Sequence, residues 1–548
     1  MSLWMPGGHE RAAAVLPVLI WAALCGALHA FSLSPWCQAW HAAAPAVCQT
    51  AALGLLLWVL WSAELKPGQA AAASWLYGTV WLIGATGWMY VSLHRYGELP
   101  AWLSALAVVA LCMALSLYMA LVGGLWGRWR RQVWWADALL FGGLWLLAEM
   151  ARAVIFTGFP WGASGYGLLG APFVALAPWL GVYGLGAVWA TLVAMLVWGL
   201  RGVGSMGARV LTAAGVVGGV LVLGAWPAAS FTKPHGRPLS VTLLQGNVPQ
   251  DEKFVSERQI PMLIWHARQI LSAQGQLVVA PETAIPLLPS QMPDGYWDKI
   301  KGGFGPASGR FALIGVPLGD FEAGYTNSVA GLSAQSILTP EGMYRYNKHH
   351  LVPFGEFIPL GFHWFVQMMN MPLGDFTRGP LNAPPFVVLD QRVAPNICYE
   401  DLYGEEIAAR FRNEVQSPTI LVNVSNLAWF GEQVAIHQHL QIARMRSLEF
   451  QLPTLRATNT GATVVIDHEG RVTHALARNT QGVLQASVQG REGATPFAWW
   501  ASRWGLWPLF GAALLMMAMG RWSVRNGKLG HAFAGASGVG AQGGPAIH

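Results

Sequence analysis

Charged residues are scarce in this chain of 548 residues, because Asp, Glu, Lys and Arg together make up 11% of it. A soluble protein usually has about a quarter of its residues charged. The shortage is also uneven: residues 11–228 hold 13 of these charges, whereas residues 229–500 hold 42. A uniformly solvated protein is therefore excluded. The composition predicts a membrane protein with a polar domain inserted near its C-terminal end.

Cysteine is scarce as well, with five residues in all, and Cys398 alone follows Cys112. The polar domain therefore has no disulfide framework of its own. A lone thiol is either a buried, inert side chain or a nucleophile. Nearer the N-terminus, Cys37 and Cys48 flank a stretch that we expect outside the membrane, where a disulfide is permitted.

A nucleic-acid partner is not expected, although the net charge is +6 and the pI is about 9.1. Most of the basic residues near the apolar stretches flank them, and such charges orient membrane helices more often than they bind a polyanion. The flanking residues are Arg128, Arg130, Arg131, Arg201, Arg209, Arg521, Arg525 and Lys528.

Long apolar runs are abundant, and a membrane-spanning helix needs roughly 20 mainly apolar residues. Eight stretches qualify, so we expect a membrane domain with seven spans over 1–228, the polar domain over 229–500, and a last span with a cytoplasmic tail over 501–548. The predicted spans are 12–30, 43–63, 74–93, 101–127, 133–151, 172–200, 209–228 and 504–520.

The basic residues also predict an orientation. If the N-terminus is cytoplasmic, then Arg128–Arg131, Arg201–Arg209 and the basic C-terminal residues all lie on the inner side, as the positive-inside rule requires. The polar domain then lies on the outer face of the membrane.

One outer loop, Ile155–Gly167, is apolar, aromatic and rich in glycine. It is either packed on the membrane surface, where aromatic residues gather, or it forms a lipid-facing wall or gate beside an active site. Two charges near the end of the preceding span, Glu149 and Arg152, give weak support for a transport path.

Strand-like and helix-like segments alternate in the polar domain, which indicates an α/β fold. A domain of about 270 residues can bury a full core. The expected strands are Leu239–Gln245, Leu277–Ala280, Phe311–Gly315, Tyr325–Leu332, Phe386–Leu389 and Thr419–Asn423, and the expected helices are 251–274 and Val434–Phe450.

Three reactive side chains lie in segments that follow strand-like runs: Glu282, Lys348 and Cys398. Because α/β folds place their sites at strand ends, these side chains could converge on one sheet edge. A thiol with an ordinary pKa of about 8.5 is mostly protonated at neutral pH. A carboxylate can take its proton, and an ammonium can stabilise the anion on a substrate carbonyl oxygen. The three groups together therefore suit acyl transfer through a thioester, although each alone is more often structural.

No metal or other cofactor is expected. His349, His350 and His363 lack the spacing of a zinc site and have no supporting cluster of carboxylates or thiolates.

In this order and spacing, the three segments resemble the carbon–nitrogen hydrolase (nitrilase) superfamily with its Glu-Lys-Cys triad. With apolar spans on both sides, nearly the whole chain resembles the apolipoprotein N-acyltransferase family of Gram-negative bacteria. The segments that carry the resemblance are Gln245–Gln250, Pro281–Thr283, Asn347–Glu356, Cys398–Glu400, Asn423–Asn426 and Ala428–Gly431.

The resemblance implies a four-layer α-β-β-α fold for the polar domain and a role for each site residue. Glu282 would be the general base, Lys348 would stabilise the tetrahedral intermediate, and Cys398 would carry the acyl group. The other positions that match essential residues of the family are Glu356, Tyr399 and Glu400.

The resemblance also implies a reaction and a place. The thiolate would take an acyl chain from a phospholipid and release a lysophospholipid. The α-amine of the diacylglyceryl-cysteine at an apolipoprotein N-terminus would then take that chain as an amide, which completes lipoprotein maturation. The enzyme would lie in the bacterial inner membrane with its catalytic domain in the periplasm. Because water would hydrolyse the thioester, water must be excluded.

Two positions depart from the family pattern. Leu427 stands where the family commonly has Asp, and Phe254 is the nearest aromatic residue after Gln250, where the family often has Trp. Nearby, Trp429 and Phe430 are either contacts for the acyl chain or ordinary core aromatics.

Two other functions compete with acyl transfer. A membrane-tethered amidase or nitrilase that hydrolyses a small amide would share every triad residue, but a simple anchor needs only one span. A non-catalytic binding or transport protein with a retired nitrilase domain would be expected to have lost Glu, Lys or Cys. We therefore predict a phospholipid–apolipoprotein N-acyltransferase.

Overall fold

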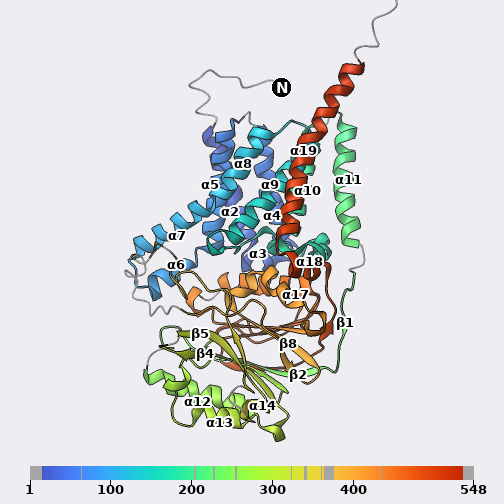
Figure 1. Cartoon of the computed structure of the whole chain (residues 1–548). Coiled ribbons are helices and arrows are strands. Elements are labelled where there is room, and N and C mark those ends of the chain that lie inside the picture. Colours follow the sequence, from blue (N-terminus) through green and yellow to red (C-terminus); the bar gives the residue numbers. More distant parts are fainter. Residues whose placement is uncertain are drawn as a thin grey trace, which may run out of the picture.

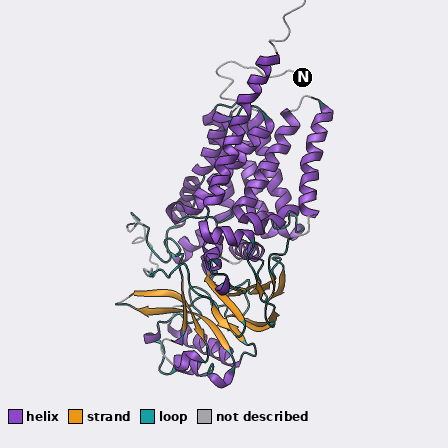
Figure 2. Cartoon of the chain, turned by 45° about the vertical axis from the view of Figure 1, so that its right-hand side comes forward, coloured by secondary structure: helices purple, strands orange, loops and turns teal. Residues whose placement is uncertain are grey.

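The structure is a computed structural model of the full chain. It describes residues 15–534 apart from 63–64, 203–204, 226–228, 254–255, 323, 339–341, 360, 363, 365–375 and 432–433. Long helices form one end of the molecule, the helical bundle, and two β-sheets with flanking helices form the other end, the sheet region (Figures 1 and 2).

The helical bundle is apolar inside and outside. Within the described residues, five helical stretches are long and apolar enough to cross a membrane: Val15–Ser32, Ala44–Trp61, Ala101–Trp129, Trp134–Thr157 and Pro172–Arg201. Large apolar side chains such as Leu106, Leu121 and Leu211 are exposed on its outer surface, as contact with hydrocarbon requires. The corresponding helices are α2 (Val15–Ser32), α4 (Ala44–Ser62), α7 (Ala101–Leu115), α8 (Leu117–Trp129), α9 (Trp134–Val154) and α10 (Ala177–Gly202).

Three further predicted spans contain helices, namely α5 (Pro67–Thr86), α11 (Met206–Ala225) and α19 (Trp507–Ala534). The predicted bounds 74–93 were wrong. Helix α5 begins at Pro67, because proline suits the first helical turn, where its missing N–H costs no hydrogen bond. It ends at Thr86, and the chain continues through α6 (Met89–Val91) and a π-helix, η1 (Ser92–Tyr96).

The sheet region contains two six-stranded sheets. The first sheet has the order β13-β2-β3-β4-β5-β6, in which β2, β3 and β4 are parallel. Its strands are β2 (Leu239–Gln245), β3 (Leu277–Val279), β4 (Phe311–Asp320), β5 (Gly324–Leu332), β6 (Tyr344–Asn347) and β13 (Gly482–Val488).

The second sheet has the order β12-β11-β10-β9-β8-β7, in which β8, β9 and β10 are parallel. All six residues of the central strand β9 are buried, as expected for a parallel strand covered on both faces. The strands are β7 (Phe386–Val388), β8 (Gln391–Ile397), β9 (Ile420–Ser425), β10 (Thr454–Thr458), β11 (Val464–Ile466) and β12 (Val472–Ala475), and a separate pair is β1 (Lys233–Pro234) with β14 (Arg491–Glu492).

Side chains of both sheets share one apolar core, which includes Leu313 of the first sheet and Val422 of the second. The far face of the first sheet packs against α12 (Ser256–Ser272) and α13 (Tyr296–Gly302). The far face of the second sheet packs against α16 (Gly404–Ala408), α18 (Pro496–Trp504) and the end of α17 (Val434–Phe450).

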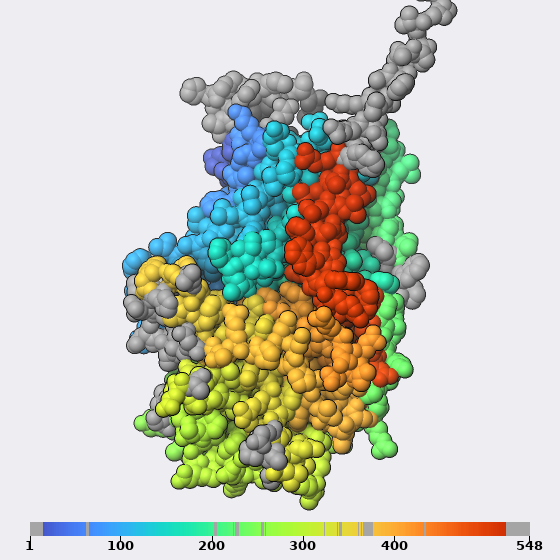
Figure 3. Space-filling model, in the orientation of Figure 1, coloured from blue at the N-terminus to red at the C-terminus, as the bar shows by residue number. Residues whose placement is uncertain are grey.

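Helix α17 also joins the sheet region to the helical bundle. Ile436 and Ala443 belong to the core between the sheets, whereas Ala435 and Met445 belong to the core of the bundle. The space-filling view shows the two parts in contact along a continuous seam on this face (Figure 3). The sheet region is therefore packed onto the bundle and not merely tethered to it.

Shortening a side chain in the shared core tests this packing. Leu313→Ala removes buried methyl groups from a position with 0% exposure and should destabilise the protein by about 2–5 kcal/mol. Thermal unfolding of the detergent-solubilised protein measures the effect. Leu338→Ala, at a position that is 69% exposed, is the matched control, and equal melting shifts in both variants would contradict the assignment of the core.

Candidate active site

The candidate nucleophile has an unusual backbone conformation. Cys398 follows the last residue of β8 and opens the 3-10 helix η8 (Cys398–Leu402) with a φ of +51°. A non-glycine residue rarely adopts this left-handed region, at a cost of about 1–3 kcal/mol. Two side chains hold the segment by donating hydrogen bonds to the Cys398 carbonyl oxygen: Asn423 Nδ2 at 3.3 Å and His439 Nε2 at 3.0 Å.

The predicted base and ammonium lie together. Glu282 follows β3, and Lys348 follows β6, so both come from strand ends of the first sheet. Lys348 Nζ lies 3.4 Å from Glu282 Oε1 and 2.8 Å from Glu356 Oε1. All three side chains are buried. The charged groups therefore come from one sheet, and the thiol comes from the other.

Asn327, on β5, is a member of this cluster that sequence reasoning missed. Its Nδ2 donates to Glu282 Oε1 at 2.8 Å and to Glu356 Oε1 at 2.7 Å. Its backbone carbonyl also accepts a hydrogen bond from the Lys348 amide at 2.8 Å. The available signal was an asparagine within a predicted strand, where asparagine is uncommon.

Backbone amides supply the remaining hydrogen bonds to the carboxylates of Glu282 and Glu356. Glu282 Oε2 accepts a hydrogen bond from the Asn426 amide at 2.8 Å, and Glu356 Oε2 accepts one from the Val352 amide at 2.8 Å. Each of the four carboxylate oxygens therefore has at least one donor. This arrangement fixes the direction in which both groups point.

The electrostatics of the site keep the thiol protonated at rest. Burial and the negative charge of Glu282 raise the pKa of Cys398 above its ordinary value, and the opposing effect of Lys348 is smaller. Burial lowers the pKa of Lys348, but the carboxylates of Glu356 and Glu282 outweigh it and raise that pKa above its ordinary value. At neutral pH the site therefore holds a thiol and an ammonium, so attack requires a base.

Comparison with known proteins identifies the family. The family model described as "Apolipoprotein N-acyltransferase N-terminal domain" matches residues 25–196, and the one described as "Carbon-nitrogen hydrolase" matches residues 240–497. A relative named apolipoprotein N-acyltransferase from Verminephrobacter eiseniae is 45% identical over 89% of this chain and 93% of its own length. The chain belongs to the apolipoprotein N-acyltransferase family.

Other relatives agree with this assignment. Proteins of the same name from Ralstonia nicotianae and Bordetella bronchiseptica are 43% and 38% identical, over 94% and 87% of this chain and 94% and 92% of their own lengths.

Among solved structures, the NitFhit protein of C. elegans matches with 16% identity and a TM-score of 0.36, over 47% of this chain and 62% of that one. A carbon–nitrogen hydrolase of Helicobacter pylori matches with 16% identity and a TM-score of 0.31, over 50% of this chain and 94% of that one.

Glu400 and Tyr399, which match family positions after the nucleophile, point in different directions. Glu400 accepts hydrogen bonds from the Ile397 amide at 2.7 Å and from the His349 amide at 2.7 Å, so it ties the nucleophile segment to the Lys348 segment. Tyr399 instead donates from its hydroxyl to the Gly158 carbonyl oxygen at 3.1 Å, in the helical bundle. Both contacts position the chain around Cys398.

Trp429 and Phe430 lie against the helical bundle. The Trp429 carbonyl accepts a hydrogen bond from Ser92 Oγ at 2.7 Å, and the Phe430 ring centroid lies 4.6 Å from that of Trp88. The two aromatics thus dock the edge of the site onto α6 and η1. Their contact with an acyl chain remains a prediction.

The apolar loop Ile155–Gly167 is mostly buried between the bundle and the nucleophile segment. Trp161 and Tyr166 are 2% and 4% exposed, whereas Phe156 is 93% exposed. Packing on the membrane surface therefore describes only a small part of this loop. Its hydrogen bond with Tyr399 places it directly behind the active site.

The departures from the family pattern differ in outcome. Leu427 is fully buried in the apolar core that includes Cys398, a surrounding in which an unpaired acid would be costly. Phe254 and His363 lie outside the described residues.

His349 Nδ1 donates to the Gly379 carbonyl. Cys37 and Cys48 are free thiols in the structure, with sulfur atoms 3.6 Å apart, so the permitted disulfide is not formed there.

Removing the shared donor tests the role of Asn327. Asn327→Ala removes the amide that donates to both buried carboxylates and leaves Lys348 as their shared partner, at a cost of about 1–3 kcal/mol. We expect acyl-enzyme formation to slow about 10- to 100-fold. Single-turnover measurements with labelled phospholipid report the rate. Thr326→Ser, which keeps the hydroxyl of the neighbouring residue on β5, is the control, and an unchanged rate in Asn327→Ala would refute this role.

The pH dependence of thiol alkylation tests the electrostatics. Because the charge of Glu282 raises the pKa of Cys398, Glu282→Gln should move the midpoint for reaction with iodoacetamide to lower pH. Because Lys348 lowers that pKa, Lys348→Met should move the midpoint to higher pH. Mass spectrometry of the Cys398 peptide measures both. Shifts of the opposite sign would contradict the proposed charges.

Proposed function

We propose that this chain transfers an acyl chain from a phospholipid, through a thioester on Cys398, to the α-amine of a diacylglyceryl-cysteine at an apolipoprotein N-terminus. The observation that carries this proposal is the place of the thiol. Cys398 is 8% exposed, its pKa is shifted by Glu282 and Lys348, and the next residues of η8 pack into the core of the helical bundle. The thiol therefore lies beside the helical bundle, the part that would hold membrane-anchored substrates.

The first half-reaction uses the thiol and the carboxylate. Glu282 takes the proton of Cys398, and the thiolate attacks the ester carbonyl of the phospholipid. Lys348 stabilises the resulting oxyanion with its positive charge. The C–O bond then breaks, and the leaving alkoxide receives the proton from Glu282. The products are a lysophospholipid and a thioester.

The second half-reaction reverses these roles. The neutral α-amine of the apolipoprotein attacks the thioester carbonyl, and Glu282 takes a proton from the attacking nitrogen. The C–S bond breaks, and the proton returns to the sulfur. The amide product leaves with a restored thiol. No water takes part in either step, and the burial of Cys398 supports the exclusion of water that transfer requires.

The setting is part of the same proposal. We place eight spans in the bacterial inner membrane, with a membrane domain over 1–228, a four-layer catalytic domain over 229–500 in the periplasm, and the last span and tail over 501–548. Helix α8 ends and α11 begins at the end of the bundle away from the sheets (Figure 1). This supports a cytoplasmic position for the basic residues at those helix ends.

Replacing the nucleophile tests the thioester. With labelled phospholipid and no acceptor, the wild-type protein should release at most one lysophospholipid per enzyme and gain one acyl mass. Cys398→Ala and Cys398→Ser should do neither, because alanine has no nucleophile and a serine hydroxyl is far less acidic than a thiol. Intact-protein mass spectrometry and lipid chromatography measure the two products.

Two results would overturn the proposal. Turnover retained by Cys398→Ala would remove the thioester from the mechanism. Continuous release of free fatty acid by the wild type without apolipoprotein would instead identify a hydrolase, as the amidase alternative requires.

A further inference from the structure

Two buried charged residues of the bundle take no part in the mechanism above. Glu149 and Arg152, on α9, are 0% and 2% exposed. A charge inside an apolar bundle is costly unless hydrogen bonds compensate for it, so such residues need a purpose. A path for an ion or solute was the purpose suggested by their positions in the sequence.

Both side chains instead bind one stretch of backbone, residues 158–164, which we call the support segment. Arg152 Nη1 donates to the carbonyls of Phe159 at 2.9 Å and Trp161 at 2.7 Å. Glu149 Oε1 accepts from the Ser164 amide at 2.8 Å, and its Oε2 accepts from the Ser164 hydroxyl at 3.1 Å. The two charges thus hold the support segment at both of its ends.

The support segment contacts the residue after the nucleophile. The Gly158 carbonyl accepts hydrogen bonds from the hydroxyls of Tyr399 and Tyr403, each at 3.1 Å. Gly158 has a φ of +81°, and a Cβ there would lie 1.8 Å from the Ala153 carbonyl oxygen. Only glycine therefore fits where the chain turns from α9 toward Tyr399.

The support segment also contacts the residue that holds the nucleophile carbonyl. The Trp161 ring is stacked on the imidazole of His439, with centroids 5.7 Å apart and planes 8° from parallel. His439 in turn donates to the Cys398 carbonyl. Next to it on α17, Gln438 Oε1 accepts from Trp161 Nε1 at 2.7 Å. Two independent routes thus connect this segment with the backbone of Cys398.

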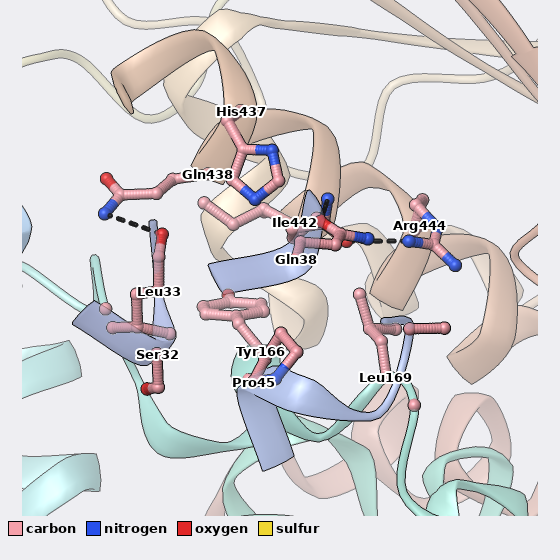
Figure 4. A pocket seen from close by; sticks show the side chains of 15 residues that line it. Ser32, Leu33, Gln38, Pro45, Tyr166, Leu169, His437, Gln438, Ile442 and Arg444 are labelled. Carbon is pink, nitrogen blue, oxygen red and sulfur yellow. Dashed lines mark hydrogen bonds between the residues drawn. The ribbon is translucent and has the colours of Figure 1, made fainter. Parts of the chain in front are cut away.

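A cavity of about 60 Å³ lies between α17, the α2–α3 region and the chain around Gly162, where α3 is Pro35–Trp40 (Figure 4). Leu33, Gly162, Tyr166 and Ile442 line it. The hydrogen bonds from α9 add to the packing that holds this segment.

We propose that Glu149 and Arg152 are positioning residues for the nucleophile. They fix the support segment within the helical bundle, and through Tyr399 and His439 the segment holds Cys398 in its left-handed conformation. The bundle is then a working part of the active site, in addition to its role as an anchor. This inference rests on the proposed function only in taking Cys398 as the nucleophile.

A double-mutant cycle between Arg152→Gln and Tyr399→Phe tests the connection. Each substitution should slow single-turnover acyl-enzyme formation from a phospholipid in mixed micelles about 10- to 100-fold, because small misplacements of a nucleophile have effects of this size. If both act through the same contact, the double variant should lie within about threefold of the slower single variant. The KM for phospholipid should stay unchanged, because no substrate contact is lost.

Arg201→Gln is the matched control. Arg201 is another arginine of the bundle that donates to a backbone carbonyl, that of Trp58 at 3.0 Å, and its variant should keep the wild-type rate. If Arg152→Gln does not accumulate as folded protein, Glu149→Gln takes its place in the cycle, because it removes the charge that holds Ser164 and keeps the size of the side chain.

The outcomes separate this inference from the function itself. Additive effects in the cycle, an unchanged rate in Arg152→Gln, or a fall in rate equal to that of Arg201→Gln would each overturn the inference. Failure of the wild-type protein to form an acyl-enzyme would instead count against the proposed function.

Discussion

Lys348 is 1% exposed, and its ammonium lies between the buried carboxylates of Glu282 and Glu356. Removing one member of a buried ion pair leaves an uncompensated charge that costs about 3–5 kcal/mol. Much of the nearby structure supplies the compensation. Asn327 serves both carboxylates, and the Asn426 amide reaches Glu282 from the second sheet. The cluster of Glu282, Lys348 and Glu356 can therefore form completely only when the two sheets are packed against each other.

The thiol depends on a different set of contacts. Cys398 belongs to the second sheet, and the residues that follow it pack into the core of the bundle. The strained left-handed conformation of Cys398 can persist only if surrounding contacts hold it in place. Asn423 on β9 and His439 on α17 hold its carbonyl oxygen, and Tyr399 is held by the helical bundle. The side chains of the candidate site are therefore held in place by three parts of the structure: the first sheet, the second sheet and the helical bundle.

Much of this could be predicted from the sequence, because the signals were local. Strand β2 and helix α17 have the predicted bounds, and Glu282 and Lys348 meet because both follow strands of one sheet. The partnership of Asn327 with Glu282, 45 residues away, and that of Tyr399 with Gly158, 241 residues away, have no periodic signal. The bounds of α5 differ from the predicted ones for another reason. The prediction rested on hydropathy alone and did not take into account that proline favours the first turn of a helix, as Pro67 does here.

The charges of the site also explain how a buried thiol can react without a large penalty. At rest, two carboxylates and one ammonium leave one net negative charge beside a neutral thiol. In the proposed mechanism, transfer of the proton to Glu282 would move that charge to sulfur without changing the total, and attack would move it to the oxyanion near Lys348. In a buried site, a change in net charge costs much free energy, whereas moving an existing charge over a few ångströms beside fixed dipoles costs little. Burial raises the pKa of Cys398, and the charge of Glu282 raises it further, since a thiolate formed without a proton acceptor would add a second negative charge.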